Sequence, residues 1–337
     1  MTMTNSQSAH QTSKLKLPMD RSILIGSGLL VLLVLLGGLL VPGFISVQNL
    51  RSILLLAAFL GIASLGQTLC ALLGALDLSI PFVIGSANIL LPSLLLSGLP
   101  PTVAILVVIA LGALVGSLNG TLSFRLQGQA LIMSLAIGFA TVGATQIYTS
   151  IGSDFGGTVF AKIPDWLRNL AAFNGKTFGI AMPPVVFIWA IIAAIMVWIM
   201  RNTWFGLGIY ALGGSRTAAQ RLRISEFKTW VTVHAISGAM SAVAGMLLLG
   251  FSGGGFVGVG DPYLFTTVAA VVIGGTSLLG GAGGYGATVL GVLVLTVLTS
   301  LLVGLGLSFA SQQAVIGALI IPMVAIYARA PHIRNQI

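Results

Sequence analysis

Residues 262–328 read PYLFTTVAAVVIGGTSLLGGAGGYGATVLGVLVLTVLTSLLVGLGLSFASQQAVIGALIIPMVAIYA, a stretch without a single charged side chain. A transmembrane helix needs about 20 apolar residues, so this interval has room for three. Glycine-rich breaks at 280–284 and 304–306 divide it into three apolar segments, at about 264–279, 286–304 and 311–328. This part of the chain is therefore predicted to cross a membrane three times.

Charge-free intervals divide the rest of the chain in the same way. They predict seven further spans, at about 22–41, 52–73, two between 78 and 124 with a break at 98–101, 130–149, 184–200 and 230–251. Only 6% of the 337 residues are charged, against roughly 25% in soluble domains. This composition excludes a soluble enzyme, a disordered chain and a nucleic-acid binder. It predicts an all-α polytopic membrane protein with about ten transmembrane helices.

The positions of Lys and Arg predict the orientation. With the N-terminus inside, eleven of the 15 basic residues lie on the cytoplasmic side and four lie outside, as the positive-inside rule requires. The net charge of +9 is therefore interpreted as a topology signal. We expect a single membrane domain over 22–329, cytoplasmic tails at 1–21 and 330–337, an outside loop at 150–183 and an inside loop at 201–229.

The inside loop holds five of the basic residues and one acid, Glu226. Such a loop is either a simple anchor on the anionic leaflet or a docking surface for a soluble partner.

Catalytic and metal-binding motifs are missing from the sequence. It contains no Gly-x-Ser-x-Gly, no His-Glu-x-x-His and no close pair of carboxylates. The Gly-Lys-Thr at 175–177 lacks the earlier glycine of a phosphate loop, because position 170 is Leu. We therefore expect no catalytic residue, no metal ligand and no cofactor in this chain.

A few polar residues fall within or beside the predicted spans. Asp77 is the acid closest to membrane depth, and it is either a helix cap before Pro81 or part of a translocation pathway. Neutral polar side chains either line a solute path or form hydrogen bonds between helices. The neutral candidates are Gln67, Asn88, Asn119, Thr141, Gln146 and Ser237. Glycine-rich breaks near 74–81 and 252–260 are either close packing or re-entrant backbone.

Four stretches resemble a known family. Gly274–Ala287 reads GGTSLLGGAGGYGA after the apolar AAVVI, Ala211–Ala219 reads ALGGSRTAA, and LGQT at 65–68 is followed by LDLS at 76–79. Their order and spacing resemble the permease subunits of bacterial ribose-type sugar ABC importers, within the binding-protein-dependent transport system inner membrane component family. The resemblance extends over about residues 22–328.

This resemblance implies a type II-like ABC importer permease fold in the bacterial inner membrane. The chain would move a sugar or similar small polar solute across the bilayer by alternating access. The implied partners are cytoplasmic ABC ATPase subunits that bind ATP and Mg²⁺, a periplasmic solute-binding protein and a second permease subunit, identical or different. The alternative is a secondary transporter coupled to ions, for which Asp77 is the one candidate acid.

In such importers, the basic inside loop presents a coupling helix to the ATPase. This segment corresponds here to about 212–226, with the candidate contacts Gly213, Gly214, Ala218, Ala219, Arg221 and Arg223. The sequence departs from the family pattern at Arg223, where the family has Gly. It also departs at 74–76 and 79–81, beside Asp77. These departures leave the expected fold unchanged, but they bear on the substrate and on the docking of the ATPase.

Overall fold

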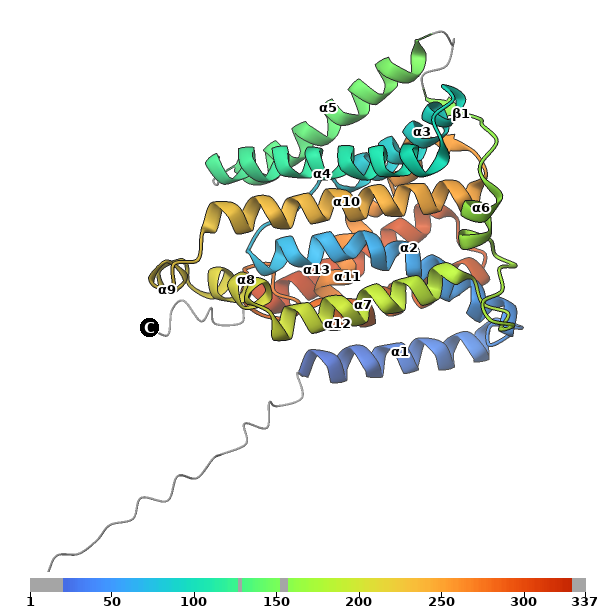
Figure 1. Ribbon diagram of the computed structural model, residues 1–337. Coiled ribbons are helices and arrows are strands. Elements are labelled where there is room, and N and C mark those ends of the chain that lie inside the picture. The colour runs from blue at the N-terminus through green and yellow to red at the C-terminus, as the bar shows by residue number, and fades with distance from the viewer. Residues whose placement is uncertain (1–20, 127–128, 152–156, 329–337) are drawn as a thin grey trace, which may run out of the picture.

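The helix α2 (Val47–Leu72) is enclosed by other helices in the structure, a computed structural model that describes residues 21–126, 129–151 and 157–328 (Figure 1). All its residues from Ala57 to Leu72 are buried. Small residues let the neighbouring helices approach closely, as they do in membrane bundles generally. A Cβ at Gly61, for example, would lie 2.1 Å from the indole nitrogen of Trp189. The core of the molecule is therefore built around this helix.

The helices α4 (Pro101–Arg125) and α10 (Glu226–Ser252) pack together along their lengths. One face of α4 carries Gly112, Gly116 and Gly120, four residues apart, and a Cβ at Gly116 would lie 2.0 Å from the carbonyl oxygen of His234. The two backbones are therefore in direct contact, which restricts sliding of one helix along the other.

Other helices surround this centre. The helix α1 packs on α12, α5 packs on α3 and α4, and α13 packs on α11, while α5 diverges from α4 toward one end of the bundle (Figure 1). Their bounds are α1 (Arg21–Leu40), α3 (Ile80–Leu96), α5 (Ala130–Ser150), α7 (Pro184–Asn202), α11 (Tyr263–Ile273), α12 (Tyr285–Gly304) and α13 (Phe309–Ala328).

Short elements lie at the two ends of the bundle (Figure 1). One end carries α6 (Asp165–Ala171), the antiparallel pair of β1 (Thr158–Val159) with β2 (Gly255–Phe256), and the 3₁₀ helix η2 (Val257–Gly260). The opposite end carries α8 (Trp204–Gly214) and α9 (Arg216–Arg221), which project beyond the long helices (Figure 1). The two loops that the sequence singles out thus lie at opposite ends.

A helix lies at each of the ten segments that the charge gaps predict. Among the described residues, seven helices are long and apolar enough to cross a membrane: α1, α2, α4, α5, α7, α10 and α12. The helices α3 and α11 are shorter, at 17 and 11 residues. The prediction that one segment reaches residue 279 is wrong, because α11 ends at Ile273 before Gly274 and the left-handed Gly275 (φ 88°).

The all-α polytopic fold is confirmed, whereas the number ten stays a prediction for the count of membrane crossings. The predicted tails lie outside the described residues, apart from Arg21.

Candidate functional site

Asp77 lies in the link between α2 and α3, where its side chain is 2% exposed. Its Oδ1 accepts hydrogen bonds from Asn119 Nδ2 and Ser134 Oγ, both at 3.0 Å, and its Oδ2 accepts one from Ser237 Oγ at 2.7 Å. The backbone N–H and the hydroxyl of Ser79 also donate to Oδ1, at 3.0 and 2.5 Å. The carboxyl group therefore joins the start of α3 to α4, α5 and α10.

Neutral groups supply all of these hydrogen bonds. Within the described part of the chain, the ion pairs found are Arg168–Asp165 and Arg216–Glu226, and neither involves Asp77. A buried acid is tolerated when several donors satisfy its oxygens. We call the group of Asp77, Ser79, Asn119, Ser134 and Ser237 the polar hub.

The hub bears on both readings of Asp77. Ser79 lies directly before α3, but its backbone angles are helical and its side chain caps no N–H. Asp77 Oδ1 accepts the N–H of Ser79 two residues later, which is the hydrogen bond of an N-cap, so the cap reading has support, while its other partners come from distant helices. A role in a translocation pathway stays a prediction. The sequence missed Ser134, because one hydroxyl in an apolar helix carries no distinguishing signal.

The other neutral candidates have three different environments. Asn88 bonds between elements: its Nδ2 donates to the Gly245 carbonyl at 2.9 Å, and its Oδ1 accepts from the Phe256 N–H at 2.8 Å. Gln146 lies exposed on α5. Gln67 is fully buried on α2, and both polar atoms of its side chain lack a hydrogen-bond partner among the described residues.

Gln67 neighbours the polar hub through Gly66. A Cβ at Gly66 would lie 2.4 Å from Ser237, whose hydroxyl donates to Asp77. One turn earlier, the hydroxyl of Ser64 is also buried and unpartnered within the described part of the chain. An unpaired buried amide costs free energy, so native proteins rarely keep one without a reason. Gln67 and Ser64, together with Ser86 on α3, are therefore buried polar groups that form no side-chain hydrogen bond with a described residue.

The last turn of α8 meets the end of α2 through backbone atoms. The N–H of Gly281 donates a 2.9 Å hydrogen bond to the Leu72 carbonyl. A Cβ at Gly213 would lie 1.9 Å from that same carbonyl oxygen and 2.5 Å from the Gly281 nitrogen. Gly280 also approaches the backbones of Gly213 and Gly74. We call this meeting of Leu72, Gly74, Gly213, Gly280 and Gly281 the glycine junction.

One side chain reinforces the glycine junction. The Tyr210 hydroxyl, on α8, donates a 2.9 Å hydrogen bond to the Gly283 carbonyl. Burial raises the pKa of Tyr210, while the charge of Arg201 acts in the opposite direction, so this hydroxyl keeps the proton that it donates. These bonds thus hold together three elements: the loop between α11 and α12, the end of α2 and the last turn of α8.

The helix α9 follows the junction, and its two alanines differ in burial. Ala218 is exposed, whereas Ala219 is fully buried against residues that include Leu212 and Trp230. Arg216 pairs with Glu226 at 3.1 Å, and its guanidinium carbon lies 5.9 Å from the centre of the Trp230 ring. Of the two predicted alanine contacts, only Ala218 is available to a partner.

The end of α9 and the two residues after it are free of such packing. Arg221, Leu222 and Arg223 are all exposed, and Leu222 has 68% of its surface accessible. Gly214 has open space where a Cβ would be, unlike Gly213 beside it. The candidate coupling residues therefore form two groups: Gly213 and Ala219 pack against other parts of the chain, whereas Ala218, Arg221 and Arg223 are exposed.

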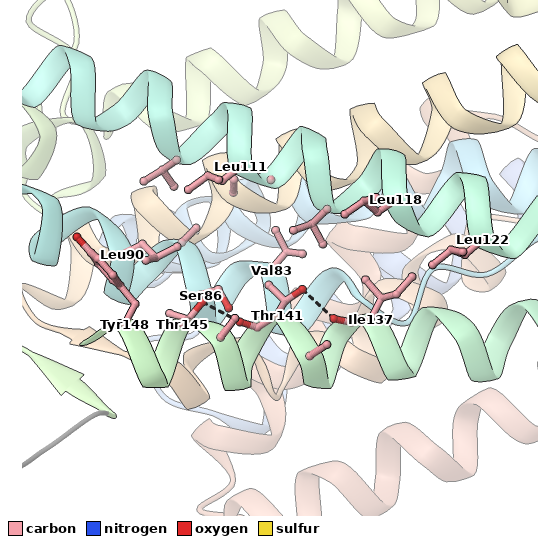
Figure 2. Close-up of a pocket in the computed structure, with 17 residues that line it drawn as sticks. Val83, Ser86, Leu90, Leu111, Leu118, Leu122, Ile137, Thr141, Thr145 and Tyr148 are labelled. Carbon is pink, nitrogen blue, oxygen red and sulfur yellow. Dashed lines mark hydrogen bonds between the residues drawn. The ribbon is translucent and has the colours of Figure 1, made fainter. Parts of the chain in front are cut away.

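A cavity of about 430 Å³ lies between α3, α4 and α5 (Figure 2). Aliphatic side chains form most of its wall, and the labelled exceptions are the hydroxyl groups of Ser86, Thr141, Thr145 and Tyr148 (Figure 2). The Thr141 and Thr145 hydroxyls already donate to carbonyls of their own helix. This wall suits a hydrocarbon chain better than a sugar, and of the polar candidates from the sequence only Thr141 lines it.

Comparison with known proteins gives consistent matches over most of the chain. The family described as "Branched-chain amino acid transport system / permease component" matches residues 49–324. The ribose import permease protein RbsC of Haemophilus influenzae is 31% identical over 299 residues, covering 89% of this chain and 90% of the relative.

Two further relatives extend the comparison. The probable ABC transporter permease protein YphD of Escherichia coli is 34% identical over 329 residues, with 93% and 95% of the two chains covered. The autoinducer 2 import system permease protein LsrC of Escherichia coli is 32% identical over 276 residues, with 81% and 77% covered. No solved structure matches.

Proposed function

The chain belongs to the family of transport-system permease components that includes the ribose import permeases, and we propose that it moves a small, hydroxyl-rich solute inward. In this proposal, a cytoplasmic ATPase drives the transport by acting on α8 and α9. Its class is that of an ABC importer permease subunit in a bacterial membrane. ATP and Mg²⁺ bind to the separate ATPase subunits, and this chain makes and breaks no covalent bond.

The glycine junction is the observation that carries the coupling part of the proposal. The helix α9 is connected through Ser215 to Gly213 in the last turn of α8, and Gly213 lies against Leu72 and Gly281 with no side chain between them. Backbone atoms in van der Waals contact cannot move independently. A displacement of α9 by a partner is therefore transmitted to the end of α2 and to the loop between α11 and α12.

The polar hub lies directly after that point of transmission. Asp77 follows Leu72 by five residues and is bonded to α4, α5 and α10. In the proposed mechanism, movement at the junction shifts the link between α2 and α3 and, through the hub, reorients these helices together. Alternating access then follows from two arrangements of one hydrogen-bonded unit.

Relatives support the class of solute. Two are named for ribose and autoinducer 2, whereas the family description names branched-chain amino acids. We assign this chain a neutral, sugar-like solute. The unpartnered Gln67 and Ser64 are the groups proposed to meet it when the helices open, because an amide and a hydroxyl complement the donors and acceptors of sugar hydroxyls.

The proposed assembly also includes a periplasmic binding protein and a second permease subunit, identical or different. Both termini are proposed to lie in the cytoplasm, on the same side as α9, because the basic inside loop contains α8 and α9.

Uptake into vesicles tests the proposal. The full complex, isolated from its native membrane, is reconstituted with its binding protein, and entry of labelled ribose is measured with enclosed ATP, with a non-hydrolysable analogue and with a protonophore. We expect uptake that needs hydrolysis and survives collapse of the proton gradient. Uptake that follows the proton gradient without ATP would support the ion-coupled alternative and overturn the proposal. Labelled leucine is the control solute. Transport of leucine in preference to ribose would overturn the assignment to sugars.

A further inference from the structure

Arg223 has a backbone conformation that is unusual for its residue type. Its φ is 57°, and among the described residues only Phe178 (φ 50°) shares a positive φ without being glycine. Arg223 follows α9, where its N–H donates to the Gln220 carbonyl at 2.9 Å and the N–H of Ile224 donates to the Ala219 carbonyl at 3.1 Å. Glycine is the usual residue in this left-handed position after a helix, because its lack of a Cβ removes the steric penalty.

Beyond these two backbone hydrogen bonds, no side-chain contact within the described chain offsets that penalty. Arg223 is exposed, and its guanidinium forms no ion pair or hydrogen bond with any described residue. The one acid in the inside loop, Glu226, already pairs with Arg216. A strained residue without an internal partner is typical of positions that are kept for a contact outside the chain.

The neighbours of Arg223 give that contact a chemical character. Arg221, Leu222 and Arg223 form consecutive exposed positions, which we call the α9 tip. The helix α9, at whose end the tip lies, projects past the ends of the long helices (Figure 1). Two guanidinium groups with an exposed leucine between them complement a surface with an apolar hollow and an acidic rim.

We propose that the left-handed turn holds the Arg223 guanidinium against a carboxylate on the cytoplasmic ATPase, with Leu222 entering an apolar hollow beside it. The inference rests on the proposed coupling function and adds the chemistry of the partner's surface. The strain at Arg223 persists because glycine, which would relieve it, supplies no charge. The basic tip thereby contributes to the choice of ATPase as well as to the transmission of force.

The substitution Arg223→Gly relieves the backbone strain and removes the charge. It therefore separates the effect on stability from the effect on ATPase binding, because the two are expected to change in opposite directions. The permease and the ATPase that co-purifies with it are obtained from native membranes and recombined in detergent. We expect the glycine variant to unfold at a higher temperature than the native chain, yet to bind the ATPase at least tenfold more weakly. The conservative variant Arg223→Lys keeps the charge and is expected to retain most of the affinity.

Phe178→Gly is the matched control. Phe178 shares the left-handed conformation, is fully exposed and lies in the loop before α7, at the end of the bundle opposite to α9. Its replacement is expected to raise the unfolding temperature in the same way without changing ATPase affinity. Equal affinity of the native chain and Arg223→Gly for the ATPase would overturn the inference, whatever happens to stability.

Two further measurements separate the inference from its alternatives. Ala218→Asp tests the coupling segment without touching the left-handed turn. If it abolishes ATPase binding while Arg223→Gly does not, the coupling function stands and the Arg223 contact fails; if neither variant affects binding, both fail. Nanodiscs with and without phosphatidylglycerol test lipid headgroups as the anionic partner. We expect the lipid to change the unfolding temperature equally in the native and Arg223→Gly chains, and a response lost only in the variant would overturn the ATPase assignment.

Discussion

The backbone N–H of Gly281 donates its hydrogen bond to the carbonyl of Leu72, although the two residues are separated by most of the chain. This bond fixes the loop before α12 onto the last turn of α2. Gly213 fits beside the same carbonyl, so the element that carries α9 is in contact with both. The end of α8, which leads into the exposed helix α9, is therefore linked to the enclosed helix α2 through backbone atoms.

Gly213→Ala should break this link. The added Cβ would lie 1.9 Å from the Leu72 oxygen, so the helices must separate, and such overpacking typically costs about 1–3 kcal/mol. We expect a lower unfolding temperature in detergent and a loss of ATP-driven uptake. Gly214→Ala is the control, because nothing lies within 4 Å of its Cβ position. Equal effects of the two substitutions would argue against the junction.

Asp77→Asn should test whether the polar hub holds the helices together. An amide in place of the carboxylate brings two N–H donors toward the hydroxyl and amide donors that now bond Asp77. Losing a hydrogen bond to a charged group costs about 1.5–3 kcal/mol. We expect reduced thermal stability, with uptake reduced in parallel. Normal stability combined with abolished uptake would instead place Asp77 in the solute pathway.

Gln67→Leu should separate stability from transport. The side chain has no hydrogen-bond partner among the described residues, so replacement by an apolar group of similar size is expected to leave stability unchanged or raise it by about 1 kcal/mol. Uptake is expected to fall at least tenfold if the amide binds solute in the open state. Asn88→Leu is the comparison variant, and it should lose stability because both polar ends of Asn88 are bonded. Full uptake by Gln67→Leu would remove Gln67 from the pathway.

The two alanines of α9 should respond oppositely to aspartate. Ala218→Asp places the charge in solvent, so we expect stability within about 0.5 kcal/mol of the native chain and ATP hydrolysis no longer linked to uptake. Ala219→Asp buries an unpaired charge among apolar side chains and is expected to destabilise the protein by several kcal/mol. Hydrolysis, uptake and unfolding temperature are measured for both. An uncoupled but unstable Ala218→Asp would contradict the assignment of that face.

The sequence predicts the helices of this fold well, because a chain in lipid must bury its backbone polar groups in helices and keep charges between them. The gaps between charges therefore locate α1, α2, α4 and α12 within a few residues. They overextend α11, whose end is set by the backbone conformation of Gly275 rather than by hydropathy.

The candidate site is less accessible to prediction. Asp77 and Asn119 are conspicuous as polar residues in apolar surroundings, but their meeting with Ser134 and Ser237 depends on how four helices are rotated. The difference in burial between Ala218 and Ala219 likewise depends on the packing of α9 against Trp230. The glycine junction has no side-chain signature, because its partners are carbonyl and amide groups that every residue carries.

The main-chain composition of the glycine junction has a consequence for how such a transporter can diversify. The joint between α8, α2 and the loop before α12 is made of main-chain atoms and glycines, whereas the α9 tip is made of side chains. In the proposed mechanism, the main-chain joint determines how the helices move, and the side chains of the α9 tip select the ATPase that moves them. Substitutions at the tip can therefore re-pair the permease with a different ATPase while the linkage geometry is inherited unaltered.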